Sequence, residues 1–212
     1  MYKTRKGEWL MTISASDVKK LRDMTGAGMM DAKKALTETS GDFDAAVKYL
    51  REKGLADSKK RADKEANQGT IGDYIHYQQD RAVSGVLVEL ACETDFVAKS
   101  DEFKDAAKQI AMHIAAMKPG YLNIEDISEE KLQEEKDIIL KQSENEGKPP
   151  EVIEKIIDGR IVSFYKDNVL NEQTFCNPEI YEGKVSTMIE EMSGKLGEKI
   201  YIKQFSRVEV GS

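Results

Sequence analysis

The middle of the chain carries the segment Cys92-Glu93-Thr94-Asp95-Phe96-Val97-Ala98-Lys99-Ser100-Asp101. The preceding residues 83–91 are rich in β-branched side chains, and their apolar residues alternate onto one face, as in a half-buried strand. After the segment, apolar residues recur at helical spacing over 103–117, and Ser100 is a suitable N-cap for that helix. The segment therefore predicts a strand, a short connector over residues 94–99 and a long helix.

Phe96 is a large apolar residue inside this polar connector. Two interpretations of it are open. The ring can fold back and close the end of the chain's own core, as is common for phenylalanine. It can also project and anchor the chain in another protein, since aromatic residues with polar surroundings dominate interface energies.

Two further strand patterns accompany residues 83–91. Residues 69–77 precede them, and residues 78–82 form a turn, which together predict an antiparallel hairpin. A hairpin alone is unstable, so the C-terminal residues 199–210 are predicted to add the third strand. Within this last run the apolar side chains divide between two faces, with Ile200 and Ile202 on one and Tyr201 and Phe205 on the other.

The first part of the chain predicts three short helices. Ser14 and Asp17 form a capping box at the start of the first helix. Residues 26–28 separate it from the second helix, Asp42 caps the third, and Gly54 is expected to end the third. Helices this short share only a small core, in a pattern that resembles a ubiquitin-associated-like bundle.

The predicted architecture is α+β, with an N-terminal three-helix bundle followed by a core in which a three-stranded antiparallel sheet packs with helices. The predicted parts are a leader over 1–11, a bundle over 12–54, a charged linker over 55–68 and a core over 69–212. The core helices are expected at 100–118, about 128–144, 150–165 and 183–197. The leader is basic and lacks the apolar centre of a secretion signal, and Met11 begins a second plausible start.

Composition and charge exclude several classes of protein. The net charge of -7 opposes general binding to nucleic-acid phosphates. No apolar run is long enough to cross a membrane. The chain has two cysteines, Cys92 and Cys176, which are too few for a disulfide framework or a zinc site. His76 and His113 are far apart in the sequence and favour structural roles, so no metal, cofactor or catalytic residue is expected.

Two local patterns have features of binding sites. Gly26-Ala27-Gly28 lacks the strand before it and the Gly-Lys-Ser/Thr ending of a phosphate-binding loop, so no direct nucleotide binding is expected. Residues 53–64 are rich in lysine and arginine, which is typical of a solvated linker helix. A contact with RNA or the ribosome is the alternative, although no aromatic residue lies between the lysines.

The string Thr94-Asp95-Phe96-Val97-Ala98 resembles the signature of elongation factor Ts, the bacterial and organellar guanine-nucleotide exchange factor for elongation factor Tu. Residues 22–36 resemble the opening signature of the same family. Further landmarks follow in the expected order: Asn145-Glu146-Gly147-Lys148-Pro149, Lys155, Gly159-Arg160 and Phe205-Ser206-Arg207. Residues 171–175 depart from the family pattern because Thr174 replaces a proline. The chain has one core repeat and resembles the short form, in which two copies commonly pair.

This resemblance implies a function in translation elongation, in a bacterial cytoplasm or an organelle. The chain is expected to bind the GDP form of elongation factor Tu and to promote GDP release by binding alone, so it is not expected to be an enzyme. Asp95 and Phe96 are implied to enter the GTP-binding domain of the partner and to disturb its Mg²⁺ site. Thr94, Val97 and Ala98 complete this motif.

Two further interactions are implied by the resemblance, and one alternative function is left open. Met29 and Met30 are implied to form a second docking surface, and a homodimer is also implied. The alternative is a non-catalytic binding module for RNA, the ribosome or ubiquitin-like partners, based on the bundle and on the lysines of residues 59–64.

Overall fold

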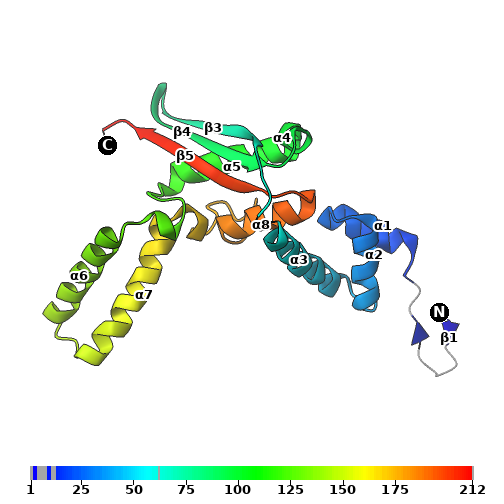
Figure 1. Ribbon diagram of the computed structural model, residues 1–212, viewed down its shortest axis with the longest axis horizontal. Helices are drawn as coiled ribbons and strands as arrows, with labels where there is room; N and C mark the ends of the chain where they lie inside the picture. Colours follow the sequence, from blue (N-terminus) through cyan, green and yellow to red (C-terminus); the bar gives the residue numbers. More distant parts are fainter. Residues whose placement is uncertain (1, 4–8, 11–12, 62, 212) are drawn as a thin grey trace. The chain divides into compact units, whose positions relative to one another are not determined.

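The computed structural model describes residues 2–3, 9–10, 13–61 and 63–211. The chain divides into two compact units, of which the first comprises Met1–Glu65 with Glu190–Lys199 and the second Ala66–Ile189 with Ile200–Ser212. Most of the predicted leader, including Met11, lies outside the described residues. Its short strands β1 (Tyr2–Lys3) and β2 (Trp9–Leu10) pair antiparallel. The helices and the three-stranded antiparallel sheet confirm the predicted α+β class (Figure 1).

The first unit contains the three predicted N-terminal helices, α1 (Ala15–Thr25), α2 (Met29–Glu38) and α3 (Phe43–Lys60). The predicted capping box is present, because the Asp17 N–H donates to Ser14 Oγ at 3.1 Å and the Ser14 N–H donates to Asp17 Oδ2 at 3.2 Å. Gly26 then ends α1 in the left-handed conformation, with φ of 68°. Local capping therefore fixes both ends of the first helix.

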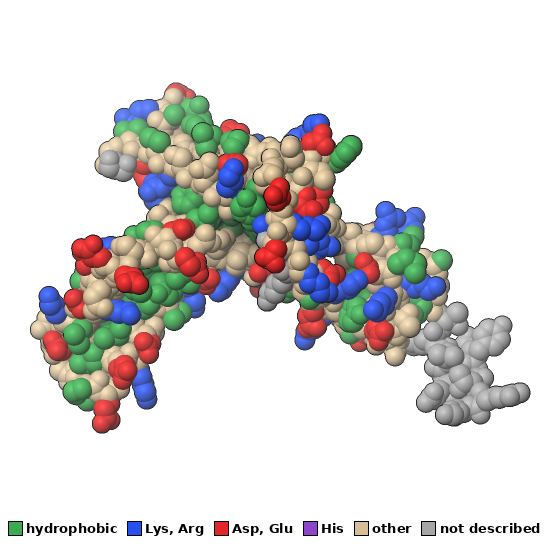
Figure 2. Space-filling view, in the orientation of Figure 1, with side chains coloured by type: hydrophobic (Ala, Val, Ile, Leu, Met, Phe, Trp, Pro, Cys, Tyr) green, Lys and Arg blue, Asp and Glu red, His purple; other side chains and the backbone are tan. Residues whose placement is uncertain are grey.

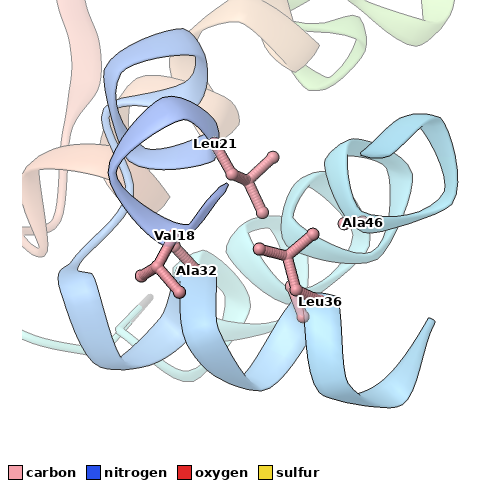
Figure 3. Packing of buried hydrophobic residues seen from close by; sticks show 6 residues of the cluster. Val18, Leu21, Ala32, Leu36 and Ala46 are labelled. Atoms are coloured by element: carbon pink, nitrogen blue, oxygen red, sulfur yellow. The ribbon is translucent and has the colours of Figure 1, made fainter. Parts of the chain in front are cut away.

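The core of the bundle is small and aliphatic (Figure 3). Its fully or nearly buried members are Val18, Leu21, Ala32, Ala35, Leu36 and Ala46. Larger side chains, including Phe43 and Leu50, pack around this cluster and are only partly buried. Alanine at the helix contacts lets the three helices approach one another closely.

The predicted end of the third helix at Gly54 is wrong, since α3 continues to Lys60. Gly54 lies against the C-terminal half of α8 (Val185–Leu196), and a Cβ placed on Gly194 would lie 2.6 Å from the Gly54 Cα. An ion pair between Arg51 and Glu191 flanks this contact. Gly54 therefore permits a close helix crossing, and this tertiary contact outweighs its low helix propensity.

The second unit is built on β3 (Gln68–Gln78), β4 (Arg81–Cys92) and β5 (Tyr201–Glu209). The strands are antiparallel in the order β3-β4-β5, which confirms both the predicted hairpin and the predicted C-terminal third strand. Helix α5 (Asp101–Met117) packs on β3 and β4, as Figure 1 shows. The buried residues of this contact are Val86, Val88 and Leu90 from β4 and Phe103, Ala107, Ile110 and Ile114 from α5.

A glycine sets the distance between α5 and the sheet. A Cβ added to Gly72 in β3 would lie 2.2 Å from the Ala107 carbonyl oxygen of α5. Because the helix backbone occupies the volume of a side chain at this point, only glycine fits there.

A β-bulge changes the predicted faces of the last strand. Leu90 pairs with Ile202, but Glu89 pairs with Gln204, so Lys203 has no partner in the register. Val88 then lies opposite Phe205. The prediction that Phe205 faces away from Ile202 is therefore wrong, since directly paired residues share one face of the sheet.

The other face of the sheet is open to solvent and carries exposed apolar side chains beside polar ones. Its exposed residues are Ile71, Ile75 and Tyr77 of β3, Leu87 of β4 and Val208 with Val210 at the end of β5. Register places Ile75, Gly85 and Val208 in one row across the three strands. A row of exposed aliphatic side chains on a sheet is typical of a surface that another molecule covers.

Two long helices form an antiparallel pair beyond α5. These are α6 (Glu129–Asn145) and α7 (Pro150–Asn168), which lie side by side in Figure 1. Short 3-10 turns, η1 (Ile124–Asp126) and η2 (Leu170–Glu172), flank the pair. The predicted helices at 128–144 and 150–165 are confirmed. No helix within the described ranges combines the length and apolar character needed to span a membrane.

Candidate functional site

The connector predicted over residues 94–99 is itself a short helix, α4 (Asp95–Lys99). Thr94 is its N-cap, and Thr94 Oγ1 accepts the Val97 N–H at 3.4 Å. At the other end, the Ser100 hydroxyl donates to the Val97 carbonyl at 2.8 Å and accepts the Phe103 N–H at 3.3 Å. One serine thus closes α4 and opens α5, which fixes the angle between the two helices.

The strand below α4 adds a further contact. Cys92 at the end of β4 is fully buried, and its thiol donates to the Thr94 carbonyl at 3.2 Å. Ala98 is buried, and α4 packs against β3 and β4. The motif is therefore mounted on the sheet through its backbone and its small residues.

Phe96 projects from this mount. Its side chain is 83% exposed, the largest exposure among the large apolar residues that the structure describes. Figure 2 shows hydrophobic atoms protruding at the position of α4, with acidic and basic atoms beside them. The interpretation in which Phe96 closes the chain's own core is therefore wrong for the free protein.

Asp95 and Lys99 form an ion pair along one turn of α4. Lys99 Nζ lies 2.6 Å from Asp95 Oδ2. The hydrogen bond from Lys99 lowers the pKa of Asp95, and the positive charge of Lys99 and the local backbone N–H groups act in the same direction. Asp95 therefore stays ionised next to the exposed ring.

Met29 and Met30, the predicted second docking surface, begin α2. Their exposed fractions are 49% and 75%, and Met24 at the end of α1 is 59% exposed. Flexible methionines exposed in this way are typical of adaptable protein-binding surfaces. These methionines belong to the first unit, whereas the Phe96 motif belongs to the second.

The lysine-rich run is partly neutralised within the first unit. Lys53 pairs with Asp31 of α2, and Lys60 lies 3.0 Å from Asp57. The hydrogen bond that Lys53 donates to the Asp31 carboxylate raises the pKa of Lys53. These pairings reduce the positive charge that the run offers to RNA phosphates.

Sequence reasoning missed a buried polar cluster around His113. His113 Nε2 lies 3.0 Å from Gln173 Oε1, its Nδ1 accepts the Cys176 N–H at 3.1 Å, and its ring stacks on Phe175. Gln173 also donates to the Asp167 carbonyl at 2.8 Å. The cluster secures the segment after α7 to α5, in the stretch where Thr174 replaces the proline of the family pattern.

The described side chains offer no grouping suited to metal or disulfide chemistry. Three or more His, Cys, Asp or Glu residues arranged to hold a metal ion are not found among the described residues. Cys92 is buried and Cys176 is exposed, and the two do not form a disulfide. The features that stand out are therefore exposed apolar surfaces: the Phe96 motif, the exposed methionines and the open sheet face.

Comparison with known proteins supports the family resemblance found in the sequence. A family model described as Elongation factor TS matches residues 10–212. Elongation factor Ts of Moorella thermoacetica is 51% identical over 199 residues, which cover 94% of this chain and 96% of that protein. The protein of the same name from Herpetosiphon aurantiacus is 47% identical over 95% of this chain and 100% of its own length. That of Fervidobacterium nodosum is 46% identical, with 95% and 100% covered. The chain belongs to the elongation factor Ts family of translation elongation factors.

Proposed function

We propose that this chain binds the GDP form of elongation factor Tu and accelerates GDP release by disturbing the Mg²⁺ and nucleotide site of that partner. The observation that carries the proposal is an exposed Phe96 on a capped, rigid helix, within a motif that resembles the family signature. Because these relatives are bacterial proteins, we place this activity in a bacterial cytoplasm.

The mechanism requires no chemical step by this chain. Exchange is a coupling free energy, in which binding of this chain weakens the hold of the partner on nucleotide, and the nucleotide weakens the binding of this chain equally. Mg²⁺ is sensitive to such a disturbance, since it needs near-ideal octahedral geometry and takes few ligands from the protein. A small displacement of those ligands lowers affinity for the nucleotide.

Burial of the Phe96 ring supplies the binding free energy in this proposal, and the capped helix α4 fixes the position of the ring. The ring exchanges a water-exposed position for an apolar one in the partner. Thr94 and Ser100 hold α4 at both ends, so little conformational entropy is lost when the ring inserts. Met29 and Met30 provide a second contact that raises affinity and orients the motif.

Stopped-flow measurement of a fluorescent GDP analogue tests this function. A bacterial elongation factor Tu loaded with the analogue is mixed with excess unlabelled GDP, with and without the chain. We expect the release rate to rise with the concentration of the chain and then saturate. Binding without faster release would eliminate exchange, and salt-sensitive RNA retention in its place would favour the binding-module alternative.

We also propose that two copies of the chain pair through the open face of the sheet. Two sheets can pack face to face about 10 Å apart and bury their apolar sides. A two-fold axis places the same surface of both copies in the interface. The exposed apolar residues around Leu87 and Val208 in one copy therefore pack against the same surface of the other. Glu89, Lys203 and Gln204 form a hydrogen-bonded polar group on this face, which restricts the register.

Sedimentation velocity of the purified chain tests the pairing. Leu87→Lys places a charge on the open face at a side chain that is 54% exposed, so the fold tolerates it while the dimer does not. Val162→Lys on α7, at a residue that is 49% exposed, is the matched control and should leave the dimer intact. A wild-type chain that sediments as a monomer at micromolar concentration would refute the pairing without affecting the exchange proposal.

A further inference from the structure

We propose that Lys99 is a positioning residue of the exchange motif, which keeps the charge of Asp95 paired while Phe96 enters the partner. This inference rests on the proposed exchange function. It assigns to Lys99 a role distinct from those of Asp95 and Phe96, because Lys99 acts through Asp95.

The geometry of α4 supports this assignment. The helix begins at Asp95 and ends at Lys99, and this spacing of four residues places both side chains on one face. Their charged atoms are 2.6 Å apart, and Phe96 directly follows Asp95 in the first turn. Because Phe96 lies one residue from Asp95 and three from Lys99 in this helix, a surface that covers the ring lies next to the ion pair.

The contribution of the ion pair depends on whether it is covered. In the free chain the side chains of Lys99 and Asp95 are 73% and 51% exposed, and a pair so accessible to water adds little to stability. In a complex the same carboxylate loses its water. A desolvated charge without a partner is costly, whereas a charge that carries its own counterion into the interface is tolerated.

Lys99 is suited to this role because the pair forms before docking. The two residues belong to one short helix whose ends are fixed by Thr94 and Ser100, so the pair is already arranged in the free chain. The Lys99 ammonium has three donors, and its contact with Asp95 uses one. The remaining N–H donors of Lys99 can reach acceptors on the partner, but the main role of Lys99 is to keep the charge of Asp95 paired.

A double-mutant cycle on the GDP-release assay tests this assignment. The variants are Lys99→Ala, Asp95→Asn and the two together, each titrated against elongation factor Tu that carries the fluorescent GDP analogue. We expect Lys99→Ala to lower the second-order rate constant for stimulated release about tenfold. In the Asp95→Asn background the same replacement should change it less than about twofold, because its target is already neutral.

Three controls separate positioning from general effects. Lys99→Arg keeps the charge and should recover most of the rate. Lys104→Ala removes another exposed lysine, which lies 3.9 Å from Asp101 in α5, and should stimulate GDP release from elongation factor Tu at the wild-type rate. The thermal unfolding midpoint of Lys99→Ala should stay within about one degree of wild type.

The outcomes distinguish this inference from the function on which it rests. A wild-type chain that does not accelerate release refutes the exchange function and this inference together. If wild type is active and Lys99→Ala is equally active, the inference alone is wrong. If Lys99→Ala costs as much in the Asp95→Asn background as in wild type, Lys99 contacts the partner directly and the positioning role is also wrong.

Discussion

Replacing Phe96 with alanine removes an apolar ring that the free chain leaves in water. Full burial of a phenylalanine side chain contributes roughly 1.5–3 kcal/mol. Because the ring is 83% exposed in the free chain, about 1.2–2.5 kcal/mol remains to be gained in a complex. If that gain acts in the exchange step, Phe96→Ala should slow stimulated GDP release roughly eightfold to seventyfold.

The same exposure predicts that the variant remains folded. The exposed Phe96 side chain makes few contacts within the chain, so little is lost on its removal. Alanine also has a higher helix propensity than phenylalanine at this position in α4. Urea unfolding should therefore give a midpoint within error of wild type. Val162→Ala replaces another exposed apolar residue, far from α4 in the sequence, and is the matched control. It should stimulate GDP release from elongation factor Tu at the wild-type rate.

The assay mixes elongation factor Tu carrying a fluorescent GDP analogue with rising concentrations of each variant. The maximal rate and the half-saturating concentration report different parts of the mechanism. A ring that acts in the exchange step lowers the maximal rate, whereas a ring that only anchors raises the half-saturating concentration. An unchanged maximal rate for a folded Phe96→Ala chain would remove the ring from the exchange step and refute this reasoning.

Four other substitutions test the fold and the second docking surface. Gly72→Ala should lower the free energy of unfolding by about 2 kcal/mol or more in urea titrations, because the new Cβ would clash with the α5 backbone. Gly159→Ala, at an exposed position of α7 with open space around it, should raise the free energy of unfolding by about 0.5–1 kcal/mol. Burial lowers the pKa of His113, so the unfolded chain gains a proton at higher pH than the folded chain. Stability should therefore fall as pH drops below about 6.5, by at most about 1.4 kcal/mol per pH unit, and His113→Gln should flatten this dependence between pH 5 and 6.5 in urea titrations. Met30→Ala should raise the half-saturating concentration in the GDP-release assay and leave the maximal rate unchanged, and an unchanged concentration would exclude Met30 from docking.

Local patterns in the sequence predicted most of the elements that carry the motif. Alternation marked β4, and the N-cap at Ser100 marked the start of α5. The C-terminal strand was placed in the sheet because a hairpin needs a third strand to be stable. These features follow from interactions between residues that are close in the sequence or share one face.

The missed features depend on contacts between distant segments. Gly54 does not end α3, because α3 continues past it and packs closely on α8, where Gly54 lies against Gly194. The bulge at Lys203 reverses the face of Phe205, and it becomes visible only in the pairing of β5 with β4. Gln173 gave no local signal of its contact with His113. Such pairings cannot be read from the periodicity of either segment alone.

The helix α4 is a different case, because its signal was present in the sequence. Thr94 followed by Asp95 is a common start for a helix. The segment was too short for apolar periodicity to identify it. The exposure of Phe96 was left open by the sequence and is decided by the position of α4 on the sheet.

The pairing of β4 with β5 also has a consequence for how the chain is synthesised. The ribosome completes Cys92 and the exchange motif long before it reaches Tyr201, so the nascent motif is attached to an incomplete two-stranded ribbon. If the proposed exchange function holds, presentation of the ring waits until β5 has been synthesised and paired with β4, and a translation product truncated before Tyr201 should bind elongation factor Tu poorly.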